Sequence, residues 1–243
     1  MEIWGLVAII LVIIIILAIL KFVFKMVKLV FWIVVILFII TSVMGIFTYK
    51  DALDMKENLE NEPKLLFLNE GKSLIAGFSV EDFNDAPKFF RFSEIVEYQN
   101  YFKKQDYKKM IDESYKMFIL DTKAFNLDNK EVDFIGGKVS KETLYLLLKS
   151  DDPIELYKSK TGVDAAIYGI EDPAEFKGNI FAVLFNDEFE SKGQLFILIE
   201  YKKNNVIVYP ETASFKMIKL MPTSFINNMF EKVKEKAVQT INN

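Results

Sequence analysis

The residue types and spacings that could support chemistry fall into a few short segments. Gly136-Gly137-Lys138 followed by Ser140 lies between an apolar run and a predicted helix, where a phosphate-binding loop would lie. Val139 stands where that loop needs Ser or Thr after the lysine. We therefore interpret these glycines as a tight turn.

A second segment is rich in oxygen ligands, with side chains from Asn126, Asp128, Asn129, Glu131 and Asp133. It lacks both the glycine at the sixth position and the bidentate glutamate at the twelfth position of a calcium-binding loop. We predict no metal and no cofactor for this chain.

A third segment carries Asp187, Glu188 and Glu190, which we interpret as a solvated acidic loop. A glycoside hydrolase needs only two carboxyl groups about 5 to 10 Å apart, so a carboxylate-dependent hydrolase is chemically possible. With 34 acidic residues, the sequence does not select the pair. The adjacent residues Ser191-Lys192 and Ser140-Lys141 are interpreted as chance neighbours, and no catalytic residue is assigned.

Cysteine and histidine are both absent. Their absence excludes disulfides, thiol nucleophiles, Cys/His zinc sites and Ser-His-Asp or Cys-His catalysis. Arg91 is the one arginine among 30 basic residues, so the chain has only one guanidinium group that could bind phosphates in a bidentate way. We expect no nucleic-acid partner.

Aromatic and basic side chains alternate between residues 88 and 109. The set contains Phe89, Phe90, Phe92, Tyr98, Tyr101, Phe102 and Tyr107, interleaved with Lys88, Lys103, Lys104, Lys108 and Lys109. Two interpretations stay open: a surface for anionic headgroups or a partner, and a half-buried helix whose aromatic side chains belong to the core.

Two uncharged apolar runs, residues 3–20 and 29–47, precede all of these segments. As helices they are about 27 to 29 Å long, close to the roughly 30 Å hydrocarbon core of a bilayer. The connector between them carries Lys21, Lys25 and Lys28. We predict a transmembrane helical hairpin over residues 1–50, with the lipid bilayer as its partner.

Particular residues are predicted to hold this hairpin in the membrane. Trp4, Trp32 and Tyr49, with Lys21, Lys25 and Lys28, are the predicted membrane-interface residues. Gly5 and Ala8 would lie at the depth of Ser42 and Gly45, where small side chains allow close helix packing. The lysine-rich connector favours the cytoplasmic side, which places both termini and the soluble domain outside.

Two other arrangements of the first fifty residues are less favourable. A signal peptide needs a basic start and a small-x-small cleavage site, and residues 1–4 carry no basic side chain. One continuous helix through Phe47 would be about 70 Å long, with three lysines near the middle of its apolar length. A turn at the membrane surface avoids that cost.

Residues 51–243 are predicted to form one soluble α+β domain with a largely antiparallel sheet and several helices. Residues 51–60 are expected to form a solvated acidic stalk. Strands are expected over residues 64–68, 73–80, 118–120, 132–135, 194–201, 206–209 and 215–220. One or two helices are expected over 93–117, and further helices after Ser140, after Asp152-Pro153, after Asp172-Pro173 and over 224–241.

These observations predict an integral membrane protein with an extracytoplasmic domain. We expect it to act by binding or assembly rather than catalysis, with a protein partner in the membrane or envelope. Two alternatives are an accessory subunit of a membrane transport or secretion complex and a carboxylate-dependent envelope hydrolase.

Overall fold

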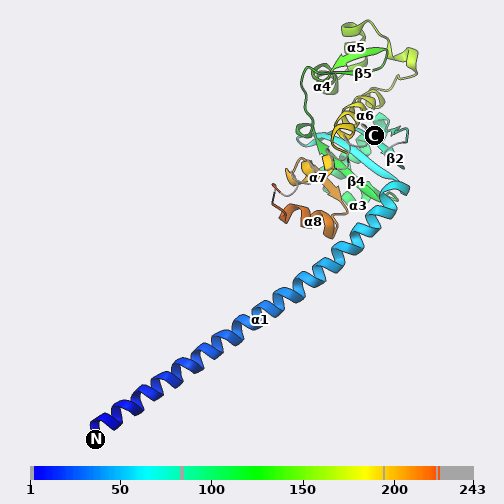
Figure 1. Ribbon diagram of the computed structural model, residues 1–243. Helices are drawn as coiled ribbons and strands as arrows, with labels where there is room; N and C mark the ends of the chain where they lie inside the picture. The colour runs from blue at the N-terminus through cyan, green and yellow to red at the C-terminus, as the bar shows by residue number, and fades with distance from the viewer. Residues whose placement is uncertain (1–2, 83–84, 194, 223, 225–243) are drawn as a thin grey trace, which may run out of the picture. The chain divides into compact units, whose positions relative to one another are not determined.

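The chain divides into two compact units, Met1–Lys50 and Asp51–Asn243, in the computed structural model (Figure 1). The structure describes residues 3–82, 85–193, 195–222 and 224. In the first helix, the described side chains are those of residues 20–51, 53–54, 57–58 and 61.

The first helix, α1 (Ile3–Asn61), is continuous over 59 residues. The two-helix hairpin predicted for residues 1–50 is therefore not shown, because the backbone has no turn between Lys21 and Lys28. The local reason is composition: this connector contains no glycine, proline or asparagine that would end a helix. From Leu20 to Asp51, α1 is long and apolar enough to cross a membrane.

A five-stranded mixed sheet forms the centre of the second unit. Its order is β3 (Lys88–Phe89), β2 (Ser73–Val80), β1 (Lys64–Glu70), β4 (Lys116–Asp121) and β7 (Val206–Tyr209). Three of its four pairings are antiparallel, whereas β1 and β4 are parallel. The predicted hairpin of residues 64–80 is confirmed, and the sheet is largely antiparallel with one parallel pair at its centre.

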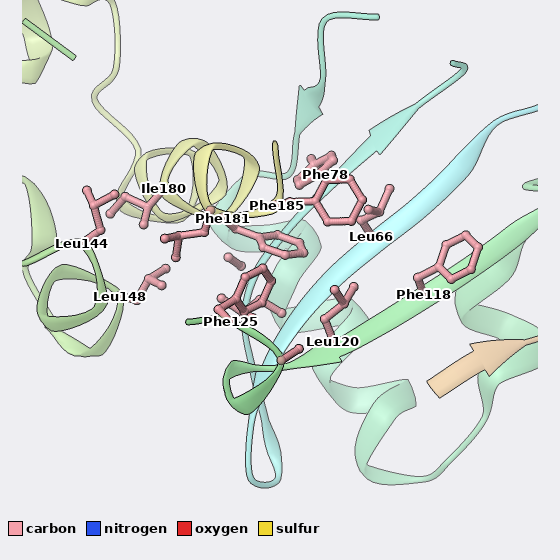
Figure 2. Close-up of a cluster of buried hydrophobic side chains, with 14 of the residues drawn as sticks. Leu66, Phe78, Phe118, Leu120, Phe125, Leu144, Leu148, Ile180, Phe181 and Phe185 are labelled. Atoms are coloured by element: carbon pink, nitrogen blue, oxygen red, sulfur yellow. The ribbon is translucent and has the colours of Figure 1, made fainter. Parts of the chain in front are cut away.

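Both faces of this sheet are covered. One face packs under α6 (Pro173–Lys192), where Figure 2 shows α6 side chains between those of the sheet and Leu144 and Leu148. The other face packs against α2 (Phe92–Lys103) and α3 (Tyr107–Ile111). Side chains alternate between the two cores along β1, so Leu66 and Leu68 face one and Leu65 and Phe67 the other.

A second, smaller sheet pairs β5 (Glu131–Phe134) with β6 (Gly137–Ser140), and α4 (Lys141–Lys149) and α5 (Pro153–Thr161) follow it. The helix starts predicted here are confirmed: Ser140, Asp152 and Asp172 each accept a hydrogen bond from the first turn of their helix. Short 3-10 turns, η1 (Thr122–Ala124) and η2 (Ala165–Tyr168), complete the connections.

Two secondary-structure predictions are wrong. Residues 195–202 form helix α7 (Leu195–Lys202) and residues 213–220 form helix α8 (Ala213–Leu220), although strands were expected there. The one or two helices expected over 93–117 are two, α2 and α3, and the last two residues of that range belong to β4. The helix expected over 224–241 lies outside the described residues, apart from residue 224.

Candidate functional site

The most prominent candidate site is the apolar surface of α1. None of its most apolar 18-residue window is buried within the structure. Lys21, Lys25 and Lys28 are exposed, as are Trp32 and Tyr49. Their role at a membrane interface stays a prediction.

The predicted helix-packing contact is not brought together in the structure. Ser42 and Gly45 are exposed, and among the described residues no atom outside the backbone of α1 itself lies within 4 Å of the position that a Cβ would take at Gly45. The side chains of Trp4, Gly5 and Ala8 lie outside those described. On one continuous helix Gly5 and Gly45 are about 60 Å apart, so the packing contact stays a prediction.

The end of α1 that belongs to the second unit is bound to the domain, which corrects the expected solvated stalk. Asp51 accepts a hydrogen bond from the backbone N–H of Ser214 at 2.6 Å, and Asp54 accepts one from the Tyr115 hydroxyl at 2.6 Å. Lys116 is 1% exposed beside them. We call these five residues the neck.

The charges of the neck support one another. Burial lowers the pKa of the Lys116 ammonium, and the carboxylates of Asp51 and Asp54 oppose that shift. Thr212 makes no side-chain cap for α8, so Asp51 satisfies one of the free N–H groups at the start of this helix. The neck therefore joins α1, β4 and α8 by charge-assisted contacts.

A charged hollow of about 310 Å³ lies beside the carboxyl-terminal half of α6. It brings together three segments that were separate candidates in the sequence: residues 126–133, the turn at Gly136-Gly137-Lys138, and the acidic trio formed by Asp187, Glu188 and Glu190. Its lining residues are Glu131, Val132, Asp133, Lys138, Val183, Asn186, Asp187 and Glu190. Folding, rather than any local pattern, makes them one site.

Beneath this hollow lies an ion cluster that the sequence did not reveal. Lys141 is 3% exposed and its ammonium lies 2.5 Å from Asp187 and 3.5 Å from Glu188. Lys130 pairs with Asp187 at 2.7 Å, and Lys192 pairs with Glu188 at 2.5 Å. The acidic trio is therefore part of a helix, with Glu188 buried, and not a solvated loop.

The electrostatics of this cluster disfavour acid catalysis by Asp187. Burial raises the pKa of this carboxyl group, but hydrogen bonds from Lys130 and Lys141 outweigh burial and hold the pKa below its ordinary value. A general acid needs a raised pKa. Asp187 therefore serves as a fixed negative charge that joins α6 to the start of α4 through Lys141 and to the residue before β5 through Lys130.

The remaining sequence candidates have structural explanations. Gly136 has a φ of +72° in the turn between β5 and β6, which confirms the tight turn. Within the described ranges, no group of three or more acidic side chains is placed to hold a metal ion.

The aromatic and basic set divides between core and surface. Phe90 is buried and Tyr98 is half-buried, and their rings pack around Phe67 at centroid distances of 5.4 and 4.7 Å. Phe92 is 63% exposed, and the lysines of the set lie on the surface. The core interpretation holds for the centre of this set.

Comparison of this chain with protein-family models, curated proteins and solved structures gives no match. The functional argument therefore depends on the geometry of α1, the neck and the charged hollow.

Proposed function

We propose that this protein is a membrane-anchored binding or assembly module whose soluble domain lies outside the cytoplasm. The observation that carries the proposal is the exposed apolar stretch Leu20–Asp51 of α1. So long an apolar surface is unfavourable in water and is suited to hydrocarbon. The module needs no reaction of its own to act as an anchored receptor or scaffold.

We further propose that α1 folds back on itself in a bilayer to make the hairpin. A helix of 59 residues extends about 88 Å, roughly three times the hydrocarbon thickness. Lys21, Lys25 and Lys28 mark the place where a turn would keep charge at the surface. Gly5 and Ala8 would then approach Ser42 and Gly45.

The lysine-rich turn supports a cytoplasmic connector and an external domain. Because the chain has no cysteine, single-cysteine variants report sidedness directly. We expect Ile167→Cys to react with a membrane-impermeant maleimide in intact cells. Lys25→Cys should react only after permeabilisation. The opposite pattern would place the domain in the cytoplasm. Equal labelling of both positions would mean that residues 29–47 do not cross the membrane, which would refute the hairpin.

A protein partner in the membrane or envelope is the second part of the proposal. The test is co-purification of the full chain in mild detergent, with Asp133→Lys and Glu190→Lys to change the charge of the hollow. A partner that uses the hollow is lost from these variants and kept by Lys160→Ala, which lies on α5. A monomer free of other proteins would oppose an accessory-subunit role.

The hollow also supports a carboxylate-dependent envelope hydrolase as a second candidate, because four carboxyl groups line one concave surface. Replacing Glu131, Asp133 and Glu190 pairwise by their amides should abolish release of sugars from cell-wall polysaccharide by the purified chain, whereas Asp187 is left in place because its pairs with Lys130 and Lys141 stabilise the fold. If the unmodified chain releases none, this candidate fails and the binding function is unaffected.

A further inference from the structure

We infer that helix α8 lies in the lipid headgroup layer and is a second membrane contact of the domain, with Lys216 and Leu220 facing an anionic bilayer surface. The inference rests on the proposed function in one respect only: residues 29–47 must cross the membrane. It assigns an interaction surface to a part of the domain that is distant in sequence from the anchor.

The first step is the depth of Asp51. Phe47 is the last residue of the apolar run, and Asp51 follows it by four residues, about 6 Å along the helix axis. The headgroup region on each side of a bilayer is about 5 to 7 Å thick. Tilt of the helix can only bring Asp51 closer to the edge of the hydrocarbon core, so Asp51 lies among the headgroups.

The second step is the contact that Asp51 makes. Its carboxylate accepts the backbone N–H of Ser214 at 2.6 Å, in the first turn of α8. The start of α8 is therefore held at the same depth as Asp51. At the other end, the Lys202 ammonium donates to the carbonyls of Ile218, Lys219 and Met221. Opposite charges at its two ends stabilise this eight-residue helix in place.

The third step is the outer face of α8. Lys216 and Leu220 are four residues apart and share this face, where Leu220 is 73% exposed. Lys219 pairs with Glu211 at 3.1 Å, whereas the Lys216 ammonium makes no hydrogen bond or ion pair within 4 Å among the described residues and interacts with Glu211 only at longer range. Phe215 is buried on the inner face. A lysine beside an exposed leucine is suited to an anionic headgroup layer above acyl chains.

The test uses single cysteines in the otherwise cysteine-free full chain. Leu220→Cys and Ile167→Cys are labelled with an environment-sensitive fluorophore and reconstituted into phosphatidylcholine vesicles with or without phosphatidylglycerol. Ile167 is the matched control, because it is 81% exposed and lies in η2, the turn that follows α5. Figure 1 shows α5 and α8 at opposite ends of the domain.

We expect the fluorophore at position 220 to emit at shorter wavelength, to be quenched by lipid-borne nitroxides and to be shielded from aqueous acrylamide. The fluorophore at position 167 should behave in the opposite way. Lys216→Ala should lower the docked fraction at position 220, with an equilibrium constant about fivefold smaller in anionic vesicles and unchanged in neutral ones. Lys160→Ala, an exposed lysine of α5, should have no effect.

Three outcomes would overturn the inference. Equal acrylamide access at both positions would place α8 in water. Shielding at position 220 without nitroxide quenching would mean that protein, such as a second copy, covers Leu220. Equal loss of docking in Lys216→Ala and Lys160→Ala would mean that any exposed lysine contributes, and that α8 has no specific role. Alkaline extraction of the same vesicles is the separate control, because release of the whole chain refutes the anchor itself.

Discussion

Removing the ammonium of Lys141 should destabilise the domain strongly. The side chain is 3% exposed and neutralises Asp187 and Glu188, whose own exposures are 20% and 5%. Breaking a buried ion pair by removing one partner costs about 3 to 5 kcal/mol, because a charge is left without compensation. Lys130 and Lys192 still contact the two carboxylates, so we expect the lower end, about 3 kcal/mol, for Lys141→Ala.

The assay is urea unfolding of the full chain in detergent micelles, followed by circular dichroism. With a denaturant slope of about 2 kcal/mol per molar, a loss of 3 kcal/mol lowers the midpoint by about 1.5 M. The matched control is Lys158→Ala, whose pair with Asp164 is also short, 2.8 Å, but exposed. It should leave the midpoint where it is. Equal midpoints for the two variants would refute the argument that burial gives the Lys141 cluster its importance.

Three further predictions concern packing, capping and pH. Gly77→Ala should cost about 1 to 3 kcal/mol, because the added methyl group would lie 2.8 Å from two buried phenylalanine rings, whereas Gly137→Ala meets nothing within 4 Å and should leave the melting temperature unchanged. Asp172→Ala should cost about 1 kcal/mol of unfolding free energy by removing the cap of α6, and Asp172→Ser should restore most of it. Asp187→Asn should lower the free energy of unfolding, and this loss should have its full size at every pH above 3.8, the ordinary pKa of the carboxyl group. The pKa of Asp187 is lowered only in the folded state, so the difference in urea midpoint between the variant and the unmodified chain should vanish as the pH falls below 3.8 in a pH series.

Local signals in the sequence were sufficient for several elements of this fold. A capping side chain followed by proline marks the starts of α5 and α6, and Gly162 ends α5 with a φ of +74°. The alternation and turn of residues 64–80 predicted the β1–β2 hairpin. Each of these features is decided by interactions within a few residues.

The misassigned elements depend on distant contacts. Residues 195–202 form an apolar run that suits either a strand or a buried helix, and length does not separate the two. In the structure Phe196, Ile197, Glu200 and Tyr201 are buried at helical spacing beneath neighbouring elements. The parallel pairing of β1 with β4 likewise joins segments about fifty residues apart.

The sequence identified charged residues of the candidate sites but not the residues that pair with them in the fold. It singled out the acidic trio of α6, but the compensating Lys141 lies 46 residues earlier. It treated Asp51 as solvated because its partner, Ser214, is 163 positions away. Patterns along the chain predict which side chains are charged, whereas the fold decides which charges meet.

The position of β1 has a consequence for biosynthesis. This strand begins three residues after α1 ends, yet it is the middle strand of the sheet and needs β4 and β7 to complete one side. Asp121, the last residue of β4, leaves the ribosome 51 residues after Glu70, roughly 3 to 10 seconds later at ordinary rates of translation, and Tyr209 of β7 follows 88 residues after that. Until β4 is made, the edge of β1 that faces it is open, and until β7 is made, the outer edge of β4 is open, so a chaperone that shields open strand edges would act at this stage.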